Sequence, residues 1–262
     1  MERVLSGIVL VPAVVAAVYF SPPWIFFLLV AAVVAIGSRE YFSMISKMGV
    51  GGYPVLGLAL SLLLALCYQL DGRYVLEWTA LALLPIFAAW FLGKKDLRDA
   101  VPQIAYTLLG VFYVGGLLGI FLPIRNMEEG RFLIFFLCVV IWMGDTAAYY
   151  AGRSFGKTPL APSVSPKKTV EGAAAGVVGN LLGGTAAHLW FLGHVPLIHC
   201  LIVAAICGII GQFGDLAESV LKRSAGVKDS GSLIPGHGGI LDRMDSLMFA
   251  GPAFYFYLRW IV

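Results

Sequence analysis

Carboxylate and basic side chains gather between residues 215 and 245 of a chain in which 60% of the residues are hydrophobic. Asp242 and Asp245 stand at positions i and i+3, so in a helix both carboxylates point the same way. Oxygen ligands on one face, with nucleotide phosphates completing the coordination shell, are a usual way for proteins to hold Mg²⁺. The spacing therefore predicts a metal-dependent phosphoryl or nucleotidyl transfer site.

A second group of polar residues continues an apolar helix beyond Phe213. Asp215, Glu218 and Lys222 occur at i, i+3 and i+7 and share one helical face, and Ser219 lies beside them. On a soluble helix such a ladder of ion pairs contributes little stability. Here the ladder directly follows an apolar span, which places its charges at the membrane boundary.

The loop at residues 226–239 has a composition suited to phosphate. Glycines adopt backbone conformations closed to other residues and let the chain approach a ligand closely. The loop also contains Lys228 and His237, which can reach phosphate oxygens. The glycines expected to let the loop backbone approach the ligand are Gly231, Gly236, Gly238 and Gly239.

Residues 152–171 form a second candidate wall of the site. Their glycines and prolines predict an irregular loop, and backbone amides with cations suit phosphate binding. Basic loops beside membrane spans are most often orientation signals only. The acidic Glu171 after the lysines, and the intramembrane carboxylate of Asp145, favour function instead. The cations are Arg153, Lys157, Lys167 and Lys168.

The elements that position these residues are apolar helices. Mean hydropathy is +0.88 and only 13% of the residues are charged, which excludes a soluble domain. A helix needs about 20 residues to span the hydrocarbon layer, so we predict an all-α, polytopic integral membrane protein with about nine transmembrane helices. The expected spans are Val4–Phe20, Trp24–Gly37, Tyr53–Leu70, Val75–Gly93, Val101–Pro123, Phe132–Ala151, Gly172–Gly193, Pro196–Phe213 and Ile240–Val262.

The chain is predicted to be a single membrane domain, residues 1–262, with scaffold helices in 1–131 and a catalytic half in 132–262. Ser21-Pro22-Pro23 breaks the first apolar stretch from the second, which predicts a tight helical hairpin. The first stretch resembles a signal peptide, but further spans follow at once, so we expect it to be retained. Fourteen Lys and Arg residues fall on one side against four on the other, which predicts a cytoplasmic N-terminus and site.

Several other features are explained by packing or solvation. The four cysteines lie in apolar spans without CxxC spacing, and His188, His194 and His199 have no carboxylate at helical spacing. The apolar residues at 41–48 recur as on a short amphipathic helix along the interface. Residues 172–193 carry a small-residue face for helix packing, formed by Gly172, Gly176, Gly179, Gly183 and Gly184.

The polar pattern at residues 219–245 resembles the complete signature of the bacterial phosphatidate cytidylyltransferases, also called CDP-diacylglycerol synthases. In this chain it reads SVLKRSAGVKDSGSLIPGHGGILDRMD. The upstream segments DTAAYYAGRSFGK and SPKKTVEG, within residues 145–172, resemble the same family. A pattern with so many fixed polar positions is highly specific.

The resemblance implies that CTP and phosphatidic acid react to give CDP-diacylglycerol and pyrophosphate, with Mg²⁺ required and a second cation allowed. A phosphatidate oxygen would attack the α-phosphorus of CTP while the protein neutralises and aligns the phosphates. The implied location is the cell inner membrane, with the site facing the cytoplasm. Membrane lipid is an expected partner, nucleic acid is not, and the glycine face is compatible with a homodimer.

Roles for individual residues follow from this reaction. The predicted metal ligands are Asp215, Asp242 and Asp245, with Asp145 and Glu171 beside them or on a second ion. The predicted phosphate and headgroup ligands are Lys167, Lys168, Lys222, Arg223, Lys228 and Arg243, together with Ser219. His237 is expected to bind pyrophosphate rather than move a proton, because phosphatidate arrives already deprotonated. The predicted catalytic set is Asp215, Asp242, Asp245, His237 and Lys222.

Two other functions fit parts of the sequence. A membrane lipid-alcohol kinase would use the same kinds of residue but attack the γ-phosphorus of a nucleotide. An ion-coupled transporter would use Asp145, Asp215 and Asp242 as proton or ion sites. Transporters place such charges near the middle of the membrane, whereas these cluster at one side, which disfavours transport.

Overall fold

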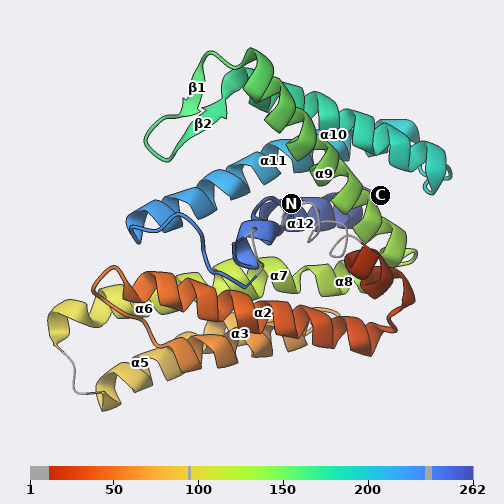
Figure 1. Ribbon diagram of the computed structural model, residues 1–262. Helices are drawn as coiled ribbons and strands as arrows, with labels where there is room; N and C mark the ends of the chain where they lie inside the picture. The colour runs from red at the N-terminus through yellow and green to blue at the C-terminus, as the bar shows by residue number, and fades with distance from the viewer. Residues whose placement is uncertain (1–11, 94–95, 234–237, 262) are drawn as a thin grey trace. The chain divides into compact units, whose positions relative to one another are not determined.

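The computed structural model describes residues 12–93, 96–233 and 238–261, and most of them are helical (Figure 1). Within this described part, five helical segments are long and apolar enough to cross a membrane. They are Pro23–Ser46, Val75–Leu92, Leu97–Asn126, Gly130–Phe155 and Leu197–Ser224. The structure thus supports the predicted class, a helical membrane protein with several spans, whereas the count of nine spans stays a prediction from the sequence.

The chain folds as two compact units. The first unit comprises Met1–Met127 and Leu221–Arg243, and the second comprises Glu128–Val220 and Met244–Val262. The segment Leu221–Arg243 belongs to the expected catalytic half but groups with the N-terminal helices. The predicted site residues are therefore divided between the two units.

The elements follow one another with short connections. Residues 12–20 are helical, and Ser21 and Pro22 interrupt the helix as predicted. The N-terminal elements are α2 (Pro23–Ser46), α3 (Pro54–Gln69), α4 (Val75–Leu81), α5 (Leu83–Leu92), η1 (Leu97–Asp99), α6 (Ala100–Gly110), η2 (Val111–Gly116), α7 (Leu117–Gly119) and α8 (Phe121–Asn126). The later elements are α9 (Gly130–Phe155), β1 (Pro159–Ala161), β2 (Ser165–Thr169), α10 (Val170–Trp190), α11 (Leu197–Ser224) and α12 (Leu241–Trp260).

Helix α2 runs without a break through Glu40 to Ser46, so the separate interfacial helix predicted for residues 41–48 is wrong. The apolar residues that suggested it include Tyr41, Met44 and Ile45, which are at most 1% exposed. They form a core stripe of the first unit instead of a membrane-surface stripe. Amphipathic spacing identifies an apolar face but does not say whether protein or lipid covers it.

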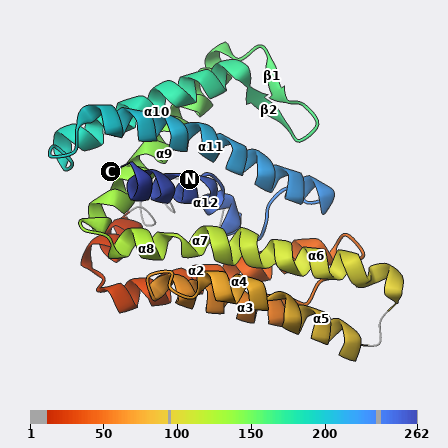
Figure 2. The ribbon, with the colours of Figure 1, turned by 180° about the vertical axis from the view of Figure 1, so that it is seen from behind.

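Close backbone contact joins α3 to the α6–α8 segment within the first unit. A Cβ at Gly115 would lie 2.7 Å from the Cα of Ser61, so this contact requires glycine. Residues 111–116 form the π-helical turn η2, and Val111 and Val114 within it are fully buried. The helices α2, α3 and α6 lie alongside one another in both views (Figures 1 and 2).

In the second unit, the predicted small-residue face packs α10 against α9. A Cβ at Gly179 would lie 2.7 Å from the carbonyl oxygen of Met143, and one at Gly183 would lie 3.0 Å from the Cα of Val140. Asn180 stands on the same face and donates through Nδ2 to the Val140 carbonyl at 2.9 Å. The glycine spacing was therefore correctly assigned to helix packing.

The loop predicted at residues 152–171 is more ordered than expected. Helix α9 continues to Phe155, and β1 then pairs with β2 as an antiparallel hairpin, with Pro159 opposite Thr169. Thr169 ends the hairpin and begins α10, because its Oγ1 accepts a hydrogen bond from Gly172 N at 3.2 Å. The protein is thus mainly helical with a short hairpin, which the all-α prediction did not include (Figure 1).

The cysteines and the quieter histidines have structural explanations, and His194 lies 2.8 Å from Glu129 Oε2, a carboxylate that the helical spacing did not reveal. Cys138, Cys200 and Cys207 are buried, and all four cysteines are free thiols. His188 contacts the Val195 carbonyl at 2.9 Å, and His199 contacts Tyr257 Oη at 2.8 Å.

Candidate active site

In the first unit the site centres on a buried ion pair. Lys222 lies in the last turn of α11 and Asp242 in the first turn of α12. Lys222 Nζ donates to Asp242 Oδ1 at 2.7 Å, and the side chains are 10% and 7% exposed. A buried pair is stable only when its remaining polar atoms also find partners.

The second oxygen of Asp242 accepts three hydrogen bonds. The backbone N and Oγ of Ser230 and the backbone N of Gly239 each lie 2.8 Å from Oδ2. Gly238 has a φ of +82°, and a Cβ there would lie 2.5 Å from the same oxygen. Position 238 requires glycine because of its positive φ and because a Cβ would clash with the Asp242 carboxylate. The glycine that was expected to approach a ligand thus lies against a carboxylate of the protein itself.

A further carboxylate, Glu40 of α2, joins this group. Glu40 Oε1 accepts from Ile240 N at 2.9 Å, and Oε2 accepts from Leu241 N at 3.0 Å and from Ser230 Oγ at 3.1 Å. Glu40 was not among the predicted site residues, although a carboxylate inside an apolar helix is a functional signal. We call Glu40, Lys222, Ser230 and Asp242 the Asp242 cluster.

Three predicted phosphate ligands of this unit are exposed, namely Arg223, Lys228 and Arg243. Arg223 donates through Nη1 to the Val227 carbonyl at 3.1 Å. Exposed guanidinium and ammonium groups can bind phosphate oxygens by charge-assisted hydrogen bonds. The predicted site residue His237 lies outside the described residues.

In the second unit, Asp245 lies among other carboxylates. The negative charges of Asp215 and Glu218 from α11, and of Asp145 from α9, all act on Asp245. Glu218 is fully buried, and Asp145 is exposed. Like charges that act on one another raise the free energy of the site unless a proton or a cation neutralises them. We call these four residues the Asp245 cluster.

The hairpin supplies a cation to this cluster. Lys168 of β2 forms an ion pair with Asp215, and the two side chains are 28% and 32% exposed. Lys167 precedes it in the strand and is exposed, so the two lysines present their side chains to opposite faces. Ser219, in the turn of α11 that follows Asp215, is buried. The structure thus brings together Lys168, Asp145, Asp215 and Asp245 of the predicted site.

Glu171 holds the start of the hairpin. Its carboxylate accepts hydrogen bonds from Lys157 N at 3.1 Å, from Thr158 N at 3.2 Å and from Thr158 Oγ1 at 2.9 Å. The Lys157 N–H contributes most, with those of Glu171 itself and Thr158, and together they lower the pKa of Glu171 to about 2. The structure therefore places this predicted metal ligand in contact with its own loop.

The donor chemistry of the Asp245 cluster fits a divalent cation. Carboxylate oxygens are the ligands that Mg²⁺ prefers, and a cation would offset their mutual repulsion. Among the described residues, no group of three or more His, Cys, Asp or Glu side chains is arranged to hold a metal ion. A cation at these carboxylates would need further ligands, and Mg²⁺ in nucleotide enzymes commonly takes them from substrate phosphates.

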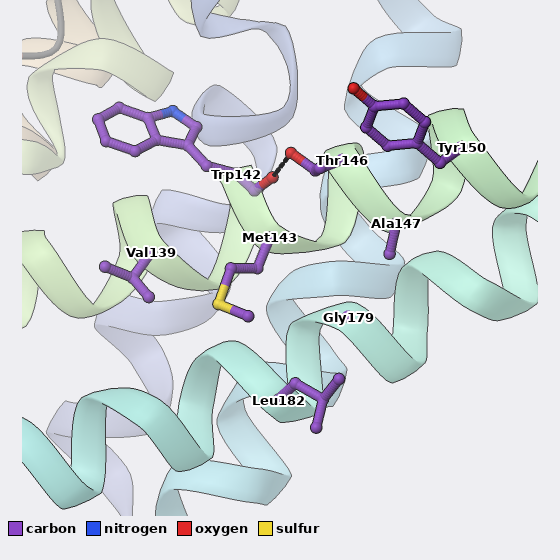
Figure 3. A pocket seen from close by; sticks show the side chains of 8 residues that line it. All are labelled: Val139, Trp142, Met143, Thr146, Ala147, Tyr150, Gly179 and Leu182. Atoms are coloured by element: carbon purple, nitrogen blue, oxygen red, sulfur yellow. Dashed lines mark hydrogen bonds between the residues drawn. The ribbon is translucent and has the colours of Figure 1, made fainter.

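An open apolar pocket of about 430 Å³ lies between α9 and α10 (Figure 3). Trp142, Met143 and Tyr150 of α9 and Leu182 of α10 are among its lining residues. The Thr146 hydroxyl, which also lines it, donates to the Trp142 carbonyl at 2.7 Å. None of the predicted site residues lines this pocket.

The chain is similar to known proteins over its whole length. The model of the cytidylyltransferase family matches residues 1–261. The phosphatidate cytidylyltransferase of Haemophilus influenzae is 35% identical over 284 residues, which cover 98% of each chain. That of Synechocystis is 32% identical over 287 residues, covering 98% of this chain and 96% of the relative. That of Bacillus subtilis is 41% identical over 192 residues, covering 73% and 71% respectively.

Proposed function

Because the chain belongs to the cytidylyltransferase family, we propose that it transfers the CMP group of CTP to phosphatidic acid, which gives CDP-diacylglycerol and pyrophosphate. The observation that carries this proposal is the set of carboxylates around Asp245, beside a lysine-bearing hairpin. Such a set suits a reaction in which several phosphate charges must be neutralised and aligned.

The reaction is a displacement at phosphorus. A phosphate oxygen of phosphatidic acid attacks the α-phosphorus of CTP, and the bond from that phosphorus to the bridging oxygen breaks. Pyrophosphate leaves with the electron pair of the broken bond. Little covalent chemistry is asked of the protein, so its contribution is mainly positioning and electrostatic stabilisation.

We assign the Mg²⁺ ligands to the Asp245 cluster, with Asp215 and Asp245 as the principal ligands and Asp145 beside them. The bound cation would neutralise the triphosphate and stabilise charge on the departing pyrophosphate. The hydrogen bonds of Asp242 and Glu171 favour a different task for these two carboxylates. Asp242 holds Ser230 and Gly239, and Glu171 holds Lys157 and Thr158.

The exposed cations are assigned to the substrates. The phosphate groups of CTP and phosphatidic acid carry more charge than one divalent cation neutralises, so basic side chains must neutralise the remainder. The proposed ligands are Lys167, Arg223, Lys228 and Arg243, and His237 stays a predicted pyrophosphate ligand. Lys168 and Lys222 serve by holding Asp215 and Asp242 in place.

We also propose how the protein is placed in the membrane. The bias of Lys and Arg residues supports a multi-pass protein of the inner membrane whose site faces the cytoplasm. About nine transmembrane helices and a homodimer built on the glycine face remain predictions from the sequence.

Labelled CTP tests the proposed reaction. The purified protein is given phosphatidic acid, Mg²⁺ and CTP labelled at either the α or the γ phosphorus. Transfer of α-label into lipid, abolished by a chelator of divalent cations, is the expected result. Transfer of γ-label into lipid would instead mean a kinase, and transfer of neither label would refute the proposal.

A further inference from the structure

Glu40 is a carboxylate buried in a largely apolar helix. It belongs to α2, an apolar helix of 24 residues, and it is only 8% exposed. An ionised side chain in such a place costs several kcal/mol unless it is paired or hydrogen-bonded. Its partners therefore explain why it is there.

Those partners include the beginning of α12, two hundred residues further along the chain. The first N–H groups of a helix have no partner inside the helix and need an acceptor. Ile240, just before α12, has an apolar side chain and cannot accept a hydrogen bond as a polar capping residue would. Glu40 accepts instead, from Ile240 N at 2.9 Å and from Leu241 N at 3.0 Å.

Ser230 links Glu40 to Asp242. Ser230 Oγ lies 3.1 Å from Glu40 Oε2 and 2.8 Å from Asp242 Oδ2. A hydroxyl has one proton, so it donates to one of these carboxylates at a time. Displacing Glu40 would therefore disturb the hydrogen bonds that hold Asp242.

The glycines of the loop admit the Glu40 side chain. A Cβ at Gly239 would lie 2.5 Å from both Glu40 oxygens, and one at Gly231 would lie 2.6 Å from Oε1. Real Cβ atoms do not come this close to an oxygen, so larger residues would push the loop away from α2. These two positions are glycine because the loop rests directly on the carboxylate.

We propose that Glu40 is a positioning residue for the reaction. It caps α12 from another helix and holds Ser230, Ile240 and Leu241 so that Asp242 keeps its bonds to Lys222, Ser230 and Gly239. Helix α2 is thus part of the catalytic apparatus and not scaffold alone. The kinetic consequence rests on the proposed function, whereas the structural consequence does not.

The test compares Glu40→Gln with Glu77→Gln, which changes an exposed carboxylate on α4. For Glu40→Gln we expect kcat to fall by about 10–100-fold, with little change in KM for CTP, because displaced loop residues would misplace the reacting groups. Hydrogen exchange at Ser230, Ile240 and Leu241 should become faster. Glu40→Asp, which keeps the charge, should recover part of the kcat.

Hydrogen exchange keeps the outcome separate from the proposed function. If the wild-type protein is inactive with CTP and phosphatidic acid, the kinetic role fails with the proposed function, whereas faster exchange in Glu40→Gln still supports the role of Glu40 in holding Ser230 and the start of α12. Wild-type kcat and wild-type exchange in Glu40→Gln would overturn the proposal. If Glu40→Gln does not accumulate, Gly239→Ala disturbs the same contact, because its Cβ would lie 2.5 Å from both Glu40 oxygens, and unchanged exchange and kcat in that variant would equally overturn the proposal.

Discussion

Asp242 and Asp245 are only three residues apart, but the Asp242 cluster and the Asp245 cluster place them in opposite electrostatic surroundings. Asp242 is held by an ammonium group and three further donors, so its charge is compensated by the protein. Asp245 is acted on by the charges of three other carboxylates. The first arrangement stabilises the fold as it stands, whereas the second would be stabilised by a bound cation, as we propose.

This difference shows that residue type and spacing do not assign a role to a carboxylate. The same i, i+3 spacing suggested one shared ligand face. The partners instead favour a loop-holding role for Asp242 and a cation-binding role for Asp245. Activity and stability should therefore respond differently when each charge is removed.

Removing the charge of Asp245 should give the largest loss of activity. For Asp245→Asn we expect kcat to fall by about 10²–10³-fold, the range seen when a preorganised electrostatic group is lost. The melting temperature should not fall, because one of several repelling charges is gone. Product formation and thermal melting check this, with the exposed Glu128→Gln of the same unit as control. A fall in stability that accounts for the lost activity would contradict the assignment.

Removing the charge of Asp242 should instead destabilise the protein. Breaking a buried pair costs about 3–5 kcal/mol, because the remaining Lys222 charge is left without its partner. The melting temperature of Asp242→Asn should fall well below that of Asp245→Asn. A double-mutant cycle with Lys222→Met isolates the coupling between the two side chains. A coupling energy near zero would show that the pair does not hold the loop.

Mg²⁺ should distinguish the two clusters directly. A ligand that binds only the folded state stabilises it by about 2.7 kcal/mol at a hundred times its Kd. We expect Mg²⁺ to raise the melting temperature of the wild type and of Asp242→Asn, but not of Asp245→Asn. If both variants lost the Mg²⁺-dependent rise in melting temperature equally, Asp242 would be a metal ligand, as predicted from the sequence.

The smallest expected effect concerns Glu171. Its pKa of about 2 lies below the ordinary value of 4.5, so its stabilising effect is present above pH 4.5 and is lost as the pH falls toward 2. Protection of the Lys157 and Thr158 amides from hydrogen exchange should therefore be constant between about pH 8 and pH 5. Glu171→Gln should lower that protection at every pH in this range. Loss of protection in the wild type near pH 6 would refute this account.

Much of the helical architecture was predictable from local patterns. Five of the predicted apolar stretches coincide with described helices that are long and apolar enough to cross a membrane, and Ser21 and Pro22 marked a helix break. Glycines spaced along residues 172–184 identified the packing face of α10. Such features depend on composition and periodicity, which the chain carries locally. The β1–β2 hairpin was missed because its strands are short and rich in proline and lysine.

The partners of the polar residues were decided by packing between distant segments. The contacts of Glu40 with Ser230 and Leu241 join residues 190 and 201 positions apart, and no local spacing reports them. Periodicity told which face of a helix a carboxylate occupies, but not which donor or charge meets that face. Because the free energy of a buried charge depends on those neighbours, the membrane class and the inventory of acids and bases could be read from the chain, whereas the task of each carboxylate required the folded structure.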